Sequence, residues 1–102
     1  MSDKLTISCR DNQVHLGGEL SFASVTDARA DWLDQCDPHR GPIVLDLSEI
    51  GRIDSAGLAL LVGWMKAAQE KGGTIRYTHL PDALLGMADV YGIQALFRTH
   101  DE

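Results

Sequence analysis

Cysteine is scarce in this chain, and its scarcity excludes two classes of protein. It occurs twice in 102 residues, with no Cys-x-x-Cys pair and no repeated spacing. Neither a disulfide framework nor a cysteine-rich metal site is therefore predicted. Because Cys9 and Cys36 lie far apart in the sequence, we expect two isolated, reduced cysteines in the core.

Long apolar runs are missing as well. The longest apolar stretch covers residues 58–65, far short of the roughly 20 residues needed to cross a bilayer. The first residues, Met1 to Lys4, carry no apolar signal region. We therefore expect no insertion into a membrane and a cytoplasmic location.

Basic residues are few and scattered. Nine Lys and Arg residues stand against 15 Asp and Glu residues, which gives a formal net charge of −6. Contact with successive phosphates requires a basic run or stripe, and the sequence has none. Direct binding of nucleic acid is not expected.

The residue patterns of common catalytic and metal sites are also lacking. The four histidines are far apart, and Cys36 and His39 form the only close Cys/His pair. No Gly-Lys-Ser/Thr phosphate loop and no Gly-x-Ser-x-Gly elbow occurs. Asp46, Glu49 and Asp54 are expected in strand-end, loop or capping positions. The sequence predicts no enzyme, no metal and no cofactor.

The composition is that of an ordinary folded domain. Hydrophobic residues make up 44% of the chain and charged residues 24%, both close to the averages of globular proteins. A chain of this length buries one core rather than two. We expect a single domain over residues 1–102.

Hydrophobic periodicity and turn residues predict the elements of the first half. Alternation over residues 5–16, with a turn at residues 10–12, predicts a hairpin whose second strand ends at Gly17-Gly18. A capping box from Ser24 to Asp27 predicts a helix over residues 25–35. The short apolar run 43–47 is typical of a strand that is covered on both faces or lies in a parallel pair.

The second half alternates helix and strand. A helix is predicted over residues 57–71, closed by Gly72-Gly73, followed by a strand over 74–78 and a helix from Pro81 to Gly92. The resulting order is β-β-α-β-α-β-α. This order predicts an α/β fold with one mixed sheet packed against helices.

A polar cluster stands at the start of the predicted helix 57–71. Asp54 or Ser55 can accept a hydrogen bond from a free amide there, and Gly57 leaves the backbone uncovered. The positive end of the helix dipole favours an anion at such a place. From the residues alone, Ser55 is either an ordinary helix cap or a functional hydroxyl.

The same helix has two apolar faces. At 100° per residue one face fills the core, and a flank turned away from it carries Leu60, Trp64 and Ala67. Either the first and third helices cover this flank, or Leu60 and Trp64 are exposed anchors of a partner surface. The core face comprises Leu58, Leu61, Val62, Met65 and Ala68.

Residues 43–61 resemble the signature of the STAS domain family. An apolar strand ends in the triplet Asp46-Leu47-Ser48, and Asp54-Ser55-Ala56-Gly57 then opens a helix. The element order resembles the STAS fold over roughly the whole chain, which implies a mostly parallel mixed sheet. Many STAS antagonists of anti-sigma factors carry a further helix after the position of Phe97, whereas this sequence ends too soon for one. This short form, together with residues 57–61 and 88–93, is most similar to the MlaB-like branch.

The resemblance implies a non-catalytic interaction module. In the MlaB-like branch, a cytoplasmic STAS subunit contacts the ATPase subunit of a phospholipid ABC transporter. The residues expected at that contact are Asp54, Ser55, Ala56, Gly57, Leu60 and Trp64. The alternative is an anti-sigma factor antagonist that a partner kinase phosphorylates on Ser55. A third hypothesis is a small-ligand domain that binds an anion at the amides around Ala56 and Gly57.

Overall fold

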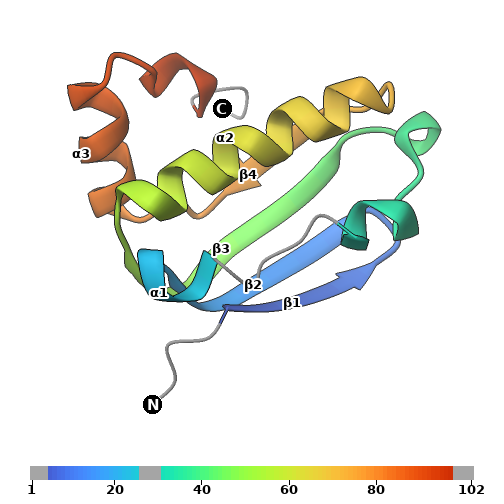
Figure 1. The fold of residues 1–102 in the computed structure, drawn as a ribbon. Helices are drawn as coiled ribbons and strands as arrows, with labels where there is room; N and C mark the ends of the chain where they lie inside the picture. Colours follow the sequence, from blue (N-terminus) through green and yellow to red (C-terminus); the bar gives the residue numbers. More distant parts are fainter. Residues whose placement is uncertain (1–4, 26–30, 98–102) are drawn as a thin grey trace.

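A mixed sheet of four strands forms the base of the fold in the computed structural model, which describes residues 5–25 and 31–97 (Figure 1). The first two strands in spatial order are antiparallel, and the other two neighbouring pairs are parallel. The predicted α/β fold with a mixed, mostly parallel sheet is confirmed. In spatial order the strands are β1 (Leu5–Arg10), β2 (Gln13–Leu20), β3 (Ile43–Ile53) and β4 (Ile75–Thr78).

The opening hairpin is confirmed, but its second strand is longer than predicted. Asp11 has φ 55° in the turn, a conformation that Asp tolerates better than most residues. Gly17 and Gly18 do not end β2; its register against β3 shifts on both sides of this pair, and the strand then continues to Leu20. The glycines therefore mark an irregularity inside a strand, as glycines in strands often do.

The central strand β3 also extends beyond its apolar run. Parallel pairing with β2 continues as far as Ile53, so Glu49 lies in a strand and the prediction of a loop there is wrong. The side chains of Ile43, Leu45 and Leu47 are buried, whereas Val44 and Asp46 between them are half-buried. The apolar run thus reflects a parallel pair with one well-covered face, not a strand covered on both.

The two long helices agree closely with the sequence prediction. The helix α2 (Ser55–Glu70) crosses one face of the sheet, and α3 (Asp82–Val90) follows β4 (Figure 1). Gly72 has φ 84°, and the amides of Gly72 and Gly73 bond to the carbonyls of Gln69 and Ala68, which ends α2 in a Schellman motif. No helix of the described residues is both long enough and apolar enough to span a membrane.

The predicted start of the first helix is wrong. A short helix α1 (Phe22–Val25) begins three residues early, and Ser24 lies inside it. The Ser24 hydroxyl accepts from the Ser21 amide at 3.0 Å and donates to the Glu19 carbonyl at 2.8 Å, so it binds back to the end of β2. Asp27 lies outside the described residues. Residues 31–35, predicted as the end of the same helix, form the 3₁₀ helix η1 (Asp31–Gln35) instead of an α-helix, and the 3₁₀ turn η2 (Pro38–Arg40) comes after it.

The core lies between the sheet and α2. Trp64 of α2 meets Trp32 of η1 edge to face, with ring centroids 5.2 Å apart at 80°. The Tyr77 hydroxyl donates to the Leu61 carbonyl at 2.6 Å, and its ring lies 5.7 Å from that of Phe97. The 3₁₀ turn η3 (Gln94–Leu96) therefore returns the end of the described chain onto the core.

Candidate functional site at the start of helix α2

Asp54 ties the start of α2 to the corner between β2 and α1. Its Oδ1 atom accepts hydrogen bonds from the amides of Ala56 at 3.0 Å and Gly57 at 3.2 Å. Its Oδ2 atom accepts from the Phe22 amide at 3.0 Å, and its own amide donates to the Leu20 carbonyl at 3.1 Å. Asp54 is therefore the N-cap of α2 and a fixed structural element.

These bonds favour the ionised carboxylate of Asp54. The Phe22 amide contributes most to holding the pKa of Asp54 below its usual value of 3.8. The amides of Gly57 and Ala56 and the charge of Arg52 act in the same direction, and partial burial opposes them. Because the folded-state pKa is lowered, the stability that Asp54 contributes is present above pH 4 or so and is lost as the pH falls through the folded-state pKa.

Asp54→Asn tests this pH dependence. The amide keeps one acceptor oxygen but loses the charge, so we expect a loss of about 1 kcal/mol at pH 7. Between pH 5 and pH 3 or so, the variant should lose less stability than the wild type, because it has no carboxylate to protonate. Urea unfolding at several pH values measures both effects, and Glu70→Gln controls for net charge. Equal pH slopes for Asp54→Asn and the wild type would contradict this account.

Ser55 is the first residue of α2, and its side chain is exposed. Since Asp54 caps the helix, the interpretation of Ser55 as an ordinary cap is wrong. Its hydroxyl forms no hydrogen bond with any side chain or backbone group of residues 5–25 and 31–97. Ser55 thus presents a hydroxyl to the surroundings at the end of the helix.

Gly57 brings two backbones into contact. A Cβ atom on Gly57 would lie 2.0 Å from the carbonyl oxygen of Leu20, so only glycine fits between α2 and the end of β2. The prediction that Gly57 leaves amides unshielded is wrong, because its amide and that of Ala56 bond to Asp54. The donors required by the anion-binding hypothesis are already occupied.

An apolar hollow lies between the first half of α2 and the residues that directly follow α3. It is an open depression with a volume of about 390 Å³. Tyr91 is 58% exposed, and the neighbouring Val90 is 81% exposed, so apolar surface continues around the rim. A hydroxyl beside an uncovered apolar depression is a surface suited to another protein. The hollow is lined by Ser55, Leu58, Ala59, Val62, Tyr91 and Ile93.

The two predicted anchors on the flank of α2 differ in burial. Trp64 is only 3% exposed because Trp32 packs against it, so its prediction as an exposed anchor is wrong. Leu60 is half-buried against the core cluster. Val62, which the periodicity assigned to the core face, is half-buried, packs against the core cluster and also lines the hollow. The helical period identified the apolar positions but not which of them the 3₁₀ turn η1 would cover.

Sequence reasoning missed two exposed aromatic residues near the site. Phe22 is 74% exposed, and its amide is bonded to Asp54, which places it beside the start of α2. No local pattern marked it. Tyr91 lies in the segment 88–93 that carried part of the family resemblance, so that resemblance was a usable signal for the hollow.

The remaining candidate carboxylates do not converge on this site. Asp46 lies inside β3, so its predicted strand-end position is wrong. Its carboxylate is on the face away from α2, 3.3 Å from His15 Nδ1 and 3.1 Å from His79 Nδ1. Glu49 is exposed farther along the strand. Among the residues that the structure describes, no group of three or more His, Cys, Asp or Glu side chains could hold a metal ion.

Comparison with known proteins identifies the class of this chain. A family model described as "Mlab, STAS domain" matches residues 5–98. The intermembrane phospholipid transport system binding protein MlaB of Haemophilus influenzae is 30% identical over 95 residues, covering 90% of this chain and 84% of that protein. The MlaB protein of Escherichia coli is 26% identical, covering 93% of this chain and 95% of that protein.

A second group of relatives bears a different name. The anti-sigma-B factor antagonist of Bacillus subtilis is 25% identical over 84 residues, covering 82% of this chain and 76% of that protein. Among solved structures, the anti-sigma factor antagonist SpoIIAA in its unphosphorylated form matches with a TM-score of 0.58 at 17% identity, covering 95% of this chain and 89% of that one. At that identity the likeness concerns the fold alone.

Proposed function

Because the chain belongs to the STAS domain family, we propose that it is a non-catalytic interaction module, the MlaB-like subunit of a phospholipid ABC transport system. Its partner in this proposal is the ATPase subunit of the transporter. The observation that carries the proposal is the exposed Ser55 hydroxyl at one end of the apolar hollow between α2 and α3. The named relatives support the choice of system.

The proposed contact requires no chemistry from this chain. An apolar side chain of the ATPase fills the hollow over Ala59 and Val62, and a polar group beside it bonds to the Ser55 hydroxyl. Asp54 and Gly57 act indirectly, because they fix the start of α2 against β2. Binding stabilises the ATPase or its assembly, and the chain acts on the cytoplasmic side of the membrane, where that subunit hydrolyses ATP.

Ser55→Asp tests this contact. The added carboxylate cannot be buried in an apolar hollow without a cost of more than 1.4 kcal/mol or so, so we expect the dissociation constant for the ATPase to rise at least about tenfold. The fold should persist because Asp54 still caps the helix. Calorimetric titration with the purified ATPase measures binding, and thermal unfolding measures stability.

Thr74→Asp is the matched control for charge. Thr74 is exposed beyond the opposite end of α2, so a carboxylate there should leave the affinity unchanged. Equal affinities of Ser55→Asp and the wild type would refute the proposed contact. A Ser55→Asp variant that unfolds would show instead that Ser55 is structural.

The alternative function is an anti-sigma factor antagonist switched by phosphorylation of Ser55. The exposed hydroxyl favours it, as does the likeness to the anti-sigma-B factor antagonist. A phosphate would add about 1.5 to 2 negative charges close to the Asp54 carboxylate and alter the surface at this helix end.

Two experiments separate the functions. Incubation with ATP and a lysate that contains the anti-sigma kinases, followed by intact-mass spectrometry, reveals whether Ser55 gains a phosphate; Ser55→Ala is the control. A pull-down from native lysate then identifies the partner. Recovery of an ABC ATPase with no phosphate on Ser55 supports the transporter role, whereas recovery of an anti-sigma kinase and a phosphorylated Ser55 supports the alternative.

A further inference from the structure

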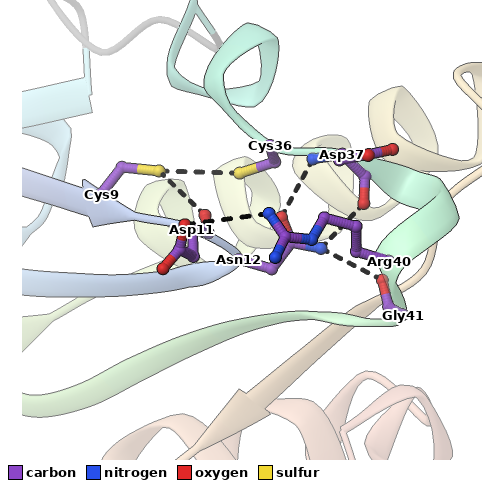
Figure 2. Close-up of polar contacts among 7 residues, drawn as sticks. All are labelled: Cys9, Asp11, Asn12, Cys36, Asp37, Arg40 and Gly41. Carbon is purple, nitrogen blue, oxygen red and sulfur yellow. Dashed lines mark hydrogen bonds and ion pairs between the residues drawn. The ribbon is translucent and has the colours of Figure 1, made fainter.

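Cys9 and Cys36 lie side by side, contrary to the expectation of two isolated cysteines. Their sulfur atoms are 3.6 Å apart (Figure 2). Cys9 is half-buried on the edge strand β1, and Cys36 is buried directly after η1. Sequence spacing could not reveal this pair, because it arises where η1 packs back onto β1.

Asn12 clamps the two cysteine-bearing segments together. From the turn of the β1–β2 hairpin, its Nδ2 donates to the carbonyls of Asp37 at 2.8 Å and Gly41 at 3.3 Å. Its Oδ1 accepts from the Asp37 amide at 2.9 Å, as Figure 2 shows. Asp37 follows Cys36 directly, and Asn12 stands three residues after Cys9. The Asn12 side chain therefore holds together the segments that directly follow the two cysteines, and this keeps the thiols close.

The surroundings distinguish the two thiols. Burial raises the pKa of Cys36 to about 12, aided by the hydrogen bond with Cys9 and by the charge that Cys9 carries when ionised. Cys36 therefore stays protonated at neutral pH. Cys9, the more exposed thiol, is the one that an oxidant reaches first.

We propose that Cys9 and Cys36, held together by the Asn12 clamp, form a reversible intramolecular disulfide when the protein meets a peroxide. A disulfide requires the sulfurs to approach to about 2.05 Å, which moves each by roughly 0.8 Å from its present place. The bond would join the edge strand β1 to the residue directly after η1, the 3₁₀ helix whose Trp32 covers Trp64. The disulfide would thereby hold Trp32 in place over Trp64, and it would leave the surface around Ser55 unchanged.

The reaction balances in two steps. The Cys9 thiolate attacks one peroxide oxygen, the O–O bond breaks, hydroxide leaves and Cys9 becomes a sulfenic acid. The Cys36 sulfur then attacks the Cys9 sulfur, the S–O bond breaks, and the Cys36 proton leaves with the oxygen as water. Two thiols lose two electrons and two protons in total, and the peroxide is reduced to two waters. A small dithiol reverses the reaction by thiol–disulfide exchange.

Intact-mass spectrometry of the full chain tests the proposal. After treatment with hydrogen peroxide, the wild type should lose about 2 Da, lose both alkylatable thiols and unfold at a temperature higher by on the order of 10 °C. Dithiothreitol should reverse all three changes. Neither Cys9→Ser nor Cys36→Ser should show the loss of about 2 Da or the rise in unfolding temperature. Two alkylatable thiols after treatment, or only dimers and over-oxidised cysteine, would overturn the proposal.

Asn12→Ala tests the clamp separately. Loss of the Asn12 bonds should lower the ratio of disulfide to dithiol in a glutathione buffer by about fivefold, as expected for a loss near 1 kcal/mol. Ser48→Ala, a substitution of an exposed residue elsewhere in the sheet, should leave the ratio unchanged. An Asn12→Ala ratio equal to that of the wild type would overturn the part of the proposal that assigns the pairing to Asn12.

Discussion

Replacing Trp64 by alanine is expected to lower the free energy of unfolding by about 3 to 5 kcal/mol. The side chain is 3% exposed in the middle of α2, so its removal leaves a cavity that the sheet below cannot close. It also removes the edge-to-face contact with Trp32, which adds about 0.5 to 1.5 kcal/mol beyond the burial of area. Urea unfolding measures the loss.

Tyr91→Ala is the matched control for Trp64→Ala. Tyr91 is an aromatic residue at the rim of the hollow and mostly exposed, so its removal should change stability by less than about 0.5 kcal/mol. The two variants should therefore differ in the property that they lose. Trp64→Ala should lose stability, whereas Tyr91→Ala should lose affinity for the partner. A Trp64→Ala variant with wild-type stability and impaired binding would show that Trp64 is a surface anchor after all.

Gly57→Ala should destabilise the protein by about 3 kcal/mol or more, although it adds a single methyl group. That methyl would lie 2.0 Å from the Leu20 carbonyl oxygen and 2.6 Å from its carbon, so backbone must move. A shift of α2 away from β2 would also strain the bond between Asp54 and the Phe22 amide. Thermal and urea unfolding measure the loss.

Gly63→Ala is the internal control for Gly57→Ala. Gly63 lies in the same helix with open space where a Cβ would be, so alanine there should stabilise by about 0.5 to 1 kcal/mol through helix propensity alone. The same substitution at two positions six residues apart should thus change the free energy of unfolding in opposite directions. If Gly57→Ala were as stable as the wild type, the close contact between α2 and β2 would be refuted.

Local signals in the sequence were sufficient for the hairpin, for α2 and for α3. Turn residues and helix-ending glycines act over a few positions, so the ends near Asp11, Gly72 and Gly92 could be predicted. The ends of β2 and β3 could not, because Gly17 and Glu49 stay in strands only through pairing with each other's strand. The sequence of either strand alone does not indicate how far such pairing extends.

The candidate site was predictable in position but not in detail. The Asp54-to-Gly57 motif was correctly predicted to lie at the start of a helix. The sequence did not show which residue caps that helix or that the amides of Ala56 and Gly57 are occupied. Both facts follow from the short distances between these amides and the Asp54 carboxylate. The burial of Trp64 depended on Trp32, a residue on a separate 3₁₀ turn. Helical periodicity identifies apolar faces, but tertiary contacts decide which face is covered.

The hydrogen bonds of Asp54 to two separate segments affect how the protein opens locally. One carboxylate holds the amide of Phe22 and those of Ala56 and Gly57, so segments 32 residues apart in the chain share one point of attachment. Fraying of the start of α2 displaces the carboxylate and so breaks the bond to Phe22 as well, whereas detachment of α1 leaves the two capping bonds in place. Local opening that begins at the start of α2 therefore spreads to α1, so the surface around Ser55 and the position of Phe22 are lost together.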